Sequence, residues 1–368
     1  MKDIAKWPKI TQLHREAVER VLDSGTLVDG NEVESLEEEF GSYVNAKHCV
    51  TLSNGTSAIY AALLALGISE GDEVIVPSLT FSGTALPVLQ VGAFPRFCDV
   101  DKQTFLIDPK KIAESINKRT RAIIVVHLHG LTADVAAIKA SIPAGIAIIE
   151  DTCQAPGAML PTGERAGTVG TVGVYSLNQS KPLWAGEGGL LVTQEMEIAA
   201  EVRRIKRYGE NLDSGGRRSY VVERMGANLR MPELSAALGR VSLTELAGVN
   251  ARARSAGQYL SNRLKEVRHC LTPFVPTGAD HTYHKYRLVV DTEIAKNALL
   301  ASDAPVATWQ HLALPLHPQF HSSDPLISAN AQWVLDHSVV VGLESAPLGE
   351  QRFETIQEWA DKISSVLA

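Results

Sequence analysis

Short apolar runs alternate with amphipathic stretches along the first half of the chain. The apolar runs are rich in Val, Ile and Leu and are bounded by Gly, Pro, Asp or Asn, as expected of buried strands. We predict strands at residues 48–52, 72–77, 96–100, 122–127 and 147–150, with helices at 59–66, 84–91 and 109–116 between them. This alternation predicts an α/β fold with a mostly parallel sheet, helices on both of its faces and ligands at the carboxyl ends of its strands.

The two ends of the chain differ from this pattern. Residues 11–24 and 32–43 carry apolar positions at helical spacing, so the chain opens with two amphipathic helices. Residues 207–224 are expected to form a polar loop, and Pro232 is expected to start a helix. Past Leu243 the pattern changes to a long helix at 246–267, followed by a mixed α+β tail. We therefore expect two domains, a large ligand-binding domain at residues 1–245 and a smaller C-terminal domain at residues 246–368.

The composition is that of a soluble globular protein. The 368 residues are 45% hydrophobic and 21% charged, and the mean hydropathy is near zero. A net charge of -7 with scattered basic residues gives no basic field, so nucleic acid is not an expected partner. The uncharged stretch from Val74 to Pro95 is long enough to span a membrane, but prolines and glycines interrupt it, and no membrane association is expected.

Cysteine and histidine spacings give no metal site. Cys49, Cys98, Cys153 and Cys270 lie far apart, which fits reduced thiols. His127 and His129 have no nearby carboxylate or cysteine to complete a metal site. His129 either lines a pocket or is a satisfied structural histidine. Because the N-terminal segment also lacks the apolar core of a signal peptide, we expect a cytoplasmic protein.

The most informative stretch is residues 169–193, with Lys181 at its centre. Strand-like runs at 171–175 and 190–193 flank a polar loop that ends in Gly186-Glu187-Gly188-Gly189. Partial burial between two strands disfavours the ammonium form and lowers the pKa of a lysine, which is what a Schiff-base lysine needs. A surface lysine in a glycine-rich hairpin is the alternative that this stretch leaves open.

The turn between strand 48–52 and helix 59–66 reads Ser53-Asn54-Gly55-Thr56-Ser57-Ala58. A strand, a glycine-containing turn and a helix start make an anion site, because the free amides and the helix dipole favour a phosphate. The hydroxyl groups of Thr56 and Ser57 can add hydrogen bonds. A plain helix cap without a ligand remains the alternative.

Asp151 closes strand 147–150, and Gln154 follows it by three residues. A carboxylate at this place can pair with a protonated ring nitrogen of a heteroaromatic cofactor, and the amide of Gln154 can donate to a phenolate oxygen. A helix-capping role for Asp151 is the alternative. Phe81 follows strand 72–77 on a polar loop, where its ring either stacks on a ligand or faces the core.

These motifs, in this order, resemble the DegT/DnrJ/EryC1/StrS family, which are pyridoxal phosphate (PLP) aminotransferases of sugars and cyclitols. Ser176 precedes Lys181 by five residues and Gly-Glu-Gly-Gly follows, as in the lysine segment of the family. Residues 226–239 resemble a family segment whose asparagine, here Asn228, binds the phosphate in the neighbouring subunit. The resemblance spans essentially the whole chain and implies fold type I, with a seven-stranded sheet in the large domain.

The resemblance also implies a role for each matching residue. Lys181 would carry PLP and move the proton during transamination, and Asp151 would keep the ring nitrogen protonated. The residues expected to bind the cofactor are Gly55, Thr56, Ser57, Phe81, Asp151, Gln154, Ser176, Lys181 and Asn228. The residues expected near the substrate are His129, Asn178, Trp184 and His284.

The implied activity is ping-pong transfer of an amino group from glutamate or glutamine to a ketone on a sugar or cyclitol. Such reactions serve antibiotic or surface-glycan biosynthesis, and the implied enzyme is a homodimer with shared active sites. Pro182 and Asn178 depart from the residues usual in the family, which leaves the substrate open.

Three other functions compete with this one. The tail at residues 333–349 resembles inosose aminotransferases and 3-amino-5-hydroxybenzoate synthases, so an aromatising aminobenzoate synthase is the closer rival. The dehydratases of the family replace the lysine with histidine, and Lys181 argues against that activity. A non-catalytic binding protein would need the lysine to be lost or the site to be blocked, and the sequence shows neither.

Overall fold

The computed structural model describes residues 7–212, 218–320, 325–342 and 347–368. The first six residues of the N-terminal segment, part of residues 207–224 and part of the tail at 333–349 lie outside these ranges. No helix within them combines the length and apolar composition that a membrane span needs.

A seven-stranded sheet lies at the centre of the molecule, with the strand order β1-β7-β6-β5-β4-β2-β3. Its strands are β1 (His48–Leu52), β2 (Glu73–Pro77), β3 (Phe94–Cys98), β4 (Thr120–Val126), β5 (Ala147–Asp151), β6 (Val172–Ser176) and β7 (Gly189–Thr193). Neighbouring strands from β6 to β3 are parallel, whereas β7 is antiparallel to both β1 and β6. The predicted mostly parallel sheet is therefore confirmed.

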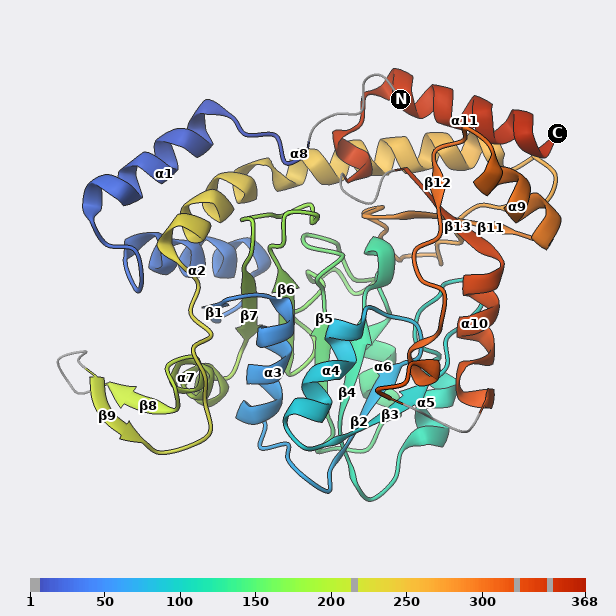
Figure 1. The fold of residues 1–368 in the computed structure, drawn as a ribbon. Helices are drawn as coiled ribbons and strands as arrows, with labels where there is room; N and C mark the ends of the chain where they lie inside the picture. Colours follow the sequence, from blue (N-terminus) through green and yellow to red (C-terminus); the bar gives the residue numbers. More distant parts are fainter. Residues whose placement is uncertain (1–6, 213–217, 321–324, 343–346) are drawn as a thin grey trace.

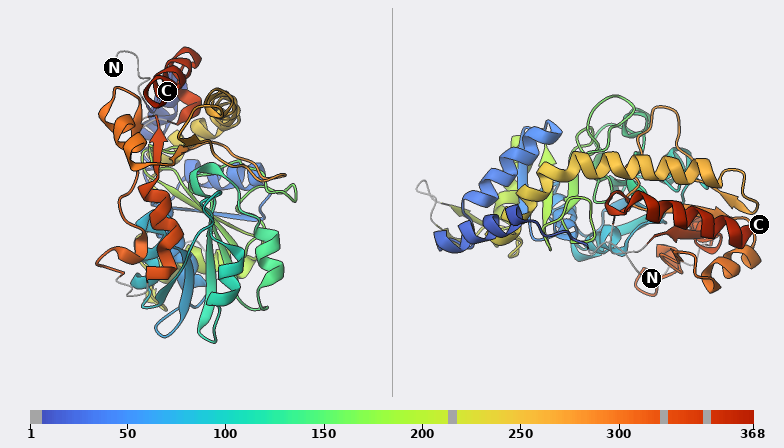
Figure 2. Two further views of the ribbon diagram at one scale, coloured as in Figure 1. Left: turned by 90° about the vertical axis from the view of Figure 1, so that its right-hand side faces the viewer. Right: turned by 90° about the horizontal axis from the view of Figure 1, so that it is seen from above.

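Helices cover both faces of this sheet (Figures 1 and 2). On one face lie α3 (Gly55–Ala65) and α4 (Ser82–Gln90), and on the other lie α5 (Pro109–Ser115) and α6 (Val135–Ser141). Asp108 and Asp134 start α5 and α6 by accepting hydrogen bonds from first-turn amides. Beside β1 lie α2 (Asn31–Val44) and α7 (Met196–Ile205), and α7 also contacts β7. The first helix, α1 (Gln12–Ser24), packs on a later helix of the chain and not on the sheet.

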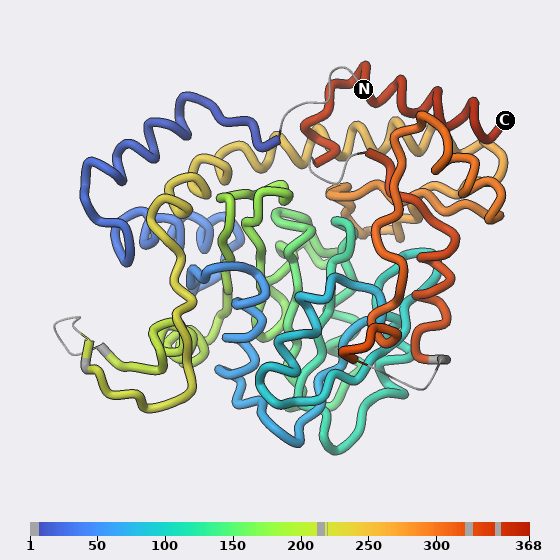
Figure 3. The backbone as a smooth tube through the Cα atoms, viewed as in Figure 1, coloured from blue at the N-terminus to red at the C-terminus, as the bar shows by residue number. Residues whose placement is uncertain are grey.

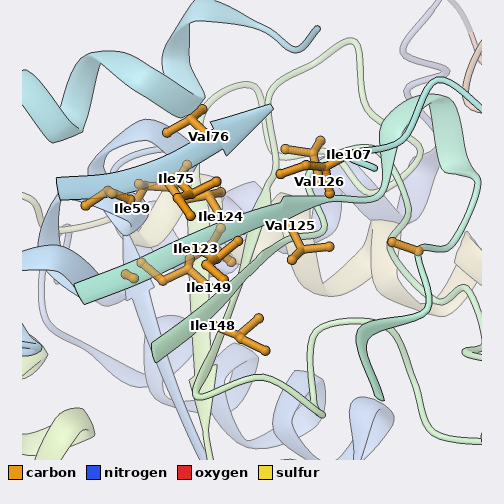
Figure 4. Close-up of a cluster of buried hydrophobic side chains, with 14 of the residues drawn as sticks. Ile59, Ile75, Val76, Ile107, Ile123, Ile124, Val125, Val126, Ile148 and Ile149 are labelled. Carbon is orange, nitrogen blue, oxygen red and sulfur yellow. The ribbon is translucent and has the colours of Figure 1, made fainter. Parts of the chain in front are cut away.

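The main hydrophobic core lies between the sheet and these helices. Figure 4 shows part of this core, including Ile59 of α3, Ile75 of β2, Ile123 and Ile124 of β4 and Ile149 of β5. Ile123 and Ile124 are successive residues of one strand, so they face the helix layers on opposite sides of the sheet. Each of these side chains is at most 1% exposed. Fully burying such an aliphatic side chain stabilises a fold by about 1.5–3 kcal/mol, and β-branched residues suit strands that are covered on both faces.

One long helix, α8 (Glu233–Leu264), runs unbroken for 32 residues along the top of the molecule in Figure 1. The helix expected to start at Pro232 and the one expected at 246–267 are therefore a single element. Its first part packs on α1 and α2, and its later part packs on α11 (Phe353–Leu367). It passes through residues 245–246, where the change of composition suggested a domain boundary.

A second, four-stranded antiparallel sheet lies in the C-terminal part, with the strand order β10-β11-β13-β12. Its strands are β10 (Cys270–Leu271), β11 (Tyr286–Val290), β12 (Val306–Ala307) and β13 (Ser338–Val341). The helices beside it are α9 (Glu293–Ala301) and α10 (Ala329–Asp336). Short 3₁₀ turns are η1 (Leu128–Gly130), η2 (Leu314–Leu316), η3 (Pro325–Ser328) and η4 (Leu348–Glu350).

A hairpin of β8 (Glu210–Leu212) and β9 (Arg218–Val222) projects at the lower left of Figure 1. The prediction of a plain polar loop over residues 207–224 was wrong here. The two strands are short and carry charged side chains, so no alternation of apolar and polar positions marks them. The guanidinium group of Arg218 donates to both carboxylate oxygens of Glu210, at 2.9 and 2.7 Å.

The chain that follows β12 returns from the second sheet to the loop after β2, and Figure 3 shows this part of the chain as an orange tube. Gln310 Nε2 donates to the main-chain oxygen of Thr80 at 2.9 Å, and the Leu314 amide donates to that of Ser78 at 3.0 Å. These bonds fix the C-terminal segment beside the carboxyl end of β2.

Candidate active site

A cleft of about 1190 Å³ opens where β5 and β6 end. The segments that line it are far apart in the sequence, and the topology brings their ends to one edge of the sheet. They include residues 54–57, 81–84, 151–154, 176–181, 284–285, 309–310 and 317.

The start of α3 forms one end of the cleft. Asn54 caps the helix, because its Oδ1 accepts a hydrogen bond from the Ser57 amide at 2.8 Å. A Cβ atom on Gly55 would lie 2.8 Å from Cys153 Sγ and 3.0 Å from Ser176 Cβ, so only glycine lets the helix start approach β6 this closely. Free first-turn amides, with the hydroxyls of Thr56 and Ser57, make this end of the cleft suitable for a phosphate.

Asp151 lies at the end of β5 and is 5% exposed. Its Oδ2 accepts a hydrogen bond from Thr84 Oγ1 at 2.8 Å, and its Oδ1 accepts one from the Cys153 amide at 3.2 Å. Thr80 Oγ1 lies 3.0 Å from Thr84 Oγ1 and extends this chain of hydroxyls. The carboxylate is thus held in one orientation at the cleft, where it can pair with a protonated ring nitrogen.

Gln154 is 6% exposed and lines the same cleft. Its Oε1 accepts a hydrogen bond from the main-chain amide of His129 at 2.8 Å. Because the oxygen is committed to this donor, the Nε2 group of Gln154 is the one available to an acceptor in the cleft.

Lys181 lies in the loop between β6 and β7, as predicted, and its half-buried side chain lines the cleft. Two hydrogen bonds shape the loop, from the Lys181 amide to the Asn178 oxygen and from the Gln179 amide to the Gly186 oxygen, at 2.9 and 2.8 Å. The charge of Lys181 lowers the pKa of His284, although burial is the larger cause of that shift. His284 lines the cleft as a neutral imidazole.

Phe81 is 60% exposed, and its ring faces the cleft and not the core. A Cβ atom on Gly83 would lie 2.9 Å from this ring, so the glycine leaves room for it. The ring is therefore free to stack on a planar ligand.

Other cleft residues were not anticipated from the sequence. Trp309, Gln310 and His317 come from the segment that follows β12, and Tyr60 and Gln90 come from α3 and α4. No local motif marks any of these residues. Only the path of the C-terminal segment brings Trp309, Gln310 and His317 to the site. Thr84 was likewise placed in a helix without any role.

The four residues expected near the substrate occupy different environments. Asn178 and His284 line the cleft, and Asn178 Nδ2 donates to Glu187 Oε1 at 2.7 Å. Trp184 is 2% exposed and stacks on His14, with ring centroids 4.8 Å apart, outside the described lining of the cleft. His129 is also absent from that lining, and its imidazole contacts Arg287 and Trp309.

Asn228 is exposed, and its Oδ1 accepts hydrogen bonds from the amide and the Nε of Arg230. Its neighbours Ala227 and Leu229 line the cleft of their own chain, whereas Asn228 is outside the described lining. The side chain is thus presented at the surface beside the mouth of the site.

Several known proteins are similar to this chain in sequence and in fold. The chain is 38% identical to the erythromycin biosynthesis sensory transduction protein EryC1 of Saccharopolyspora erythraea, over 82% of this chain and 81% of that protein. It is 36% identical to the UDP-2-acetamido-2-deoxy-3-oxo-D-glucuronate aminotransferase of Pseudomonas aeruginosa, over 82% of both chains. The crystal structure of 3-amino-5-hydroxybenzoic acid synthase superposes with a TM-score of 0.90 at 26% identity, over 99% of this chain and 98% of that chain.

The fold and the cleft define a PLP-dependent aminotransferase of fold type I. Residues 8–347 match the DegT/DnrJ/EryC1/StrS aminotransferase family, and the chain belongs to that family.

The donor set in the cleft fits PLP. The start of α3 and Ser176 would hold the phosphate, Asp151 the ring nitrogen and Gln154 the phenolic oxygen, with Lys181 at the aldehyde carbon. The thiol of Cys153 is not a competing nucleophile, since burial and then the charge of Asp151 raise its pKa well above the ordinary value.

Proposed function

We propose that this aminotransferase moves an amino group from an amino acid, glutamate or glutamine, to a ketone on a sugar or cyclitol. Relatives at 33–36% identity are named as aminotransferases of UDP- or dTDP-linked sugars, which supports this acceptor class. The observation that carries the proposal is that Lys181, Asp151 and the start of α3, whose amides suit a phosphate, meet in one cleft of about 1190 Å³. A cleft of this size has room for a ring-shaped acceptor beside the cofactor.

When bound, PLP supplies an electron sink for the carbanion that forms as the substrate loses a proton. Lys181 would hold the cofactor, leave it when an amino donor arrives, and then move the proton between the donor carbon and the cofactor. Thr84 and the Cys153 amide orient Asp151, so that its negative charge keeps the ring nitrogen protonated. Phe81 would cover one face of the cofactor ring. The cleft-lining residues of the C-terminal segment would limit the entry of water.

The active unit is proposed to be a homodimer with shared sites. Asn228 would contact the phosphate bound to the partner subunit, and its exposed position beside the cleft mouth supports this role. Within each subunit, residues 1–245 would bind the cofactor, and residues 246–368 would close the substrate side. We place the enzyme in the cytoplasm, in antibiotic or surface-glycan biosynthesis.

An aromatising synthase of the aminobenzoate type is the second candidate. The superposition on 3-amino-5-hydroxybenzoic acid synthase at a TM-score of 0.90 favours it. A panel of keto sugars, inososes and cyclic aminoketone precursors separates the two, because only the synthase forms an aromatic product with its own ultraviolet absorbance.

Borohydride reduction followed by peptide mapping tests the assignment of Lys181. The cofactor should be fixed to the peptide that carries Lys181, and Lys181→Ala should abolish both the fixation and the transfer of an amino group. Lys285→Ala is the matched control, because Lys285 also lines the cleft. Fixation to residue 285, or turnover by Lys181→Ala, would sink the proposal.

A further inference from the structure

Arg287 is a buried cation outside the cleft lining. It lies on β11, is 3% exposed, and donates from Nε to His129 Nε2 at 3.0 Å and from Nη1 to Ser338 Oγ at 2.8 Å. Its guanidinium carbon lies 5.2 Å from the centre of the Trp309 ring. Among the residues that the structure describes, no carboxylate pairs with it and Nη2 has no partner. Burying a charge in this way is costly, so a role other than stability is indicated.

His129 receives the Nε hydrogen bond and stands in an unusual backbone conformation. Its φ angle is 59°, in the left-handed region that residues other than glycine rarely occupy. Contacts on both sides hold it there. The Lys285 amide donates to the His129 main-chain oxygen at 3.2 Å, and the imidazole meets Trp309 edge to face at 4.8 Å. Since Nε2 accepts from Arg287, the ring proton is assigned to Nδ1.

The main-chain amide of His129 is the donor that fixes Gln154. It donates to Gln154 Oε1 at 2.8 Å and so leaves Gln154 Nε2 for the cleft. A rotation of the residue 129 backbone would remove this donor, and the amide group of Gln154 could then turn its oxygen toward the cofactor. An oxygen facing a phenolate would repel it, where the nitrogen attracts it.

We propose that Arg287 is a positioning residue that acts through His129 to hold the amide of Gln154 in its donating orientation. The inference rests on the cofactor assignment but not on the identity of the ketone. It also links the second sheet to the cofactor site, because Arg287 belongs to β11 and Gln154 follows β5.

Four variants test this chain of contacts, with PLP affinity of the apoenzyme and the pH midpoint of the bound-cofactor absorbance as readouts. Gln154→Ala removes the donor to the phenolic oxygen, so PLP affinity should fall about tenfold, the equivalent of one net hydrogen bond. The absorbance midpoint should also move to higher pH, because the phenolate loses a donor.

Arg287→Met keeps the length of the side chain without donors and should shift both readouts in the same direction. The double variant should equal Gln154→Ala alone, because both act through one amide. Arg287→Gln, which retains a donor toward His129 without the charge, should restore most of both readouts.

Ser338→Ala is the matched control. It removes the Nη1 partner of Arg287 and leaves the bond to His129, so both readouts should stay at the wild-type values. If Arg287→Met fails to fold, His129→Ala provides the same test, because it removes the imidazole that accepts the hydrogen bond from Arg287. Additive shifts in the double variant, or wild-type values in Arg287→Met, would overturn the proposal while leaving the Lys181 assignment intact, since borohydride fixation tests that separately.

Discussion

Gly55→Ala is a sharp test of the phosphate site, because it adds one methyl group at the tightest point of the helix start. The new Cβ atom would lie 2.8 Å from Cys153 Sγ, 3.0 Å from Ser176 Cβ and 3.5 Å from Ser176 Cα. Ordinary separation between such atoms is about 3.5–4.0 Å, so the start of α3 must move away from β6 by roughly 0.5–1 Å.

A shift of this size decides whether the amides of α3 still reach a phosphate. A hydrogen bond of about 2.9 Å would lengthen to about 3.5 Å and be lost. Losing one bond to a charged group costs about 1.5–3 kcal/mol, so PLP affinity should fall about tenfold to a hundredfold. Alanine also favours a helix over glycine by up to about 1 kcal/mol, which offsets part of an overpacking cost of about 1–3 kcal/mol. The apoenzyme should therefore lose much less stability than cofactor affinity.

The assay is a PLP titration of the apoenzyme, followed by fluorescence, together with its thermal unfolding. Cys153→Ala removes the nearest of the three contacts, so the double variant with Gly55→Ala should recover part of the affinity. Cys153→Ala alone is the control and should bind PLP normally. Wild-type affinity and melting temperature in Gly55→Ala would refute the placement of the phosphate at the start of α3.

Three further predictions follow from other parts of the structure. Asp151→Asn should keep PLP but slow half-transamination by about three orders of magnitude, because the charge opposite the ring nitrogen is lost. Stopped-flow absorbance measures this rate, and a wild-type rate would mean that another group faces that nitrogen. Burial lowers the pKa of His281 from 6.5 to about 3, so between these pH values the unfolded chain binds a proton that the native protein does not. Stability contributed by this site is thus fully present above pH 6.5 and falls by up to about 1.4 kcal/mol per pH unit below it. Urea unfolding at pH 7 and pH 4.5 should show a smaller loss in His281→Asn, and an equal loss would contradict the assignment. Mixing Lys181→Ala with Asn228→Ala subunits should restore up to one working site per heterodimer, whereas heterodimers without activity would exclude the shared site.

The strands of the large sheet could be predicted because they are buried on both faces, which requires apolar runs in the sequence. Each predicted strand of the sheet lies within two residues of its observed position, and strands such as β4 carry an almost continuous apolar run. The β8–β9 hairpin leaves no such trace, since its strands are short and partly charged. The unbroken course of α8 was also missed, because a change of composition near Leu243 resembles a boundary while the backbone continues as a helix.

The residues of the candidate site are likewise of two kinds, those with a local signal in the sequence and those without one. Lys181, Asp151 and the turn at 53–58 could be located because each has a local signal next to a strand end. The hydroxyl pair of Thr80 and Thr84 gave no signal, since its hydrogen bond to Asp151 spans 67 residues of sequence. The hydrogen bond of His129 with Arg287 spans 158 residues of sequence, so the motif around His129 does not show where its imidazole lies.

The unbroken α8 has a consequence for engineering chimaeras with related enzymes. A crossover at residues 245–246 would join two half-helices, and any mismatch in their register would rotate one apolar face relative to the other by about 100° per residue. The inserted part would then lose its fit to α1 and α2, or to α11. A crossover after Leu264, where α8 ends, keeps all 32 residues of the helix from one parent and places the junction in a loop. Cleft-lining segments exchanged in this way would include His284, Trp309 and His317 while the native helix stays whole.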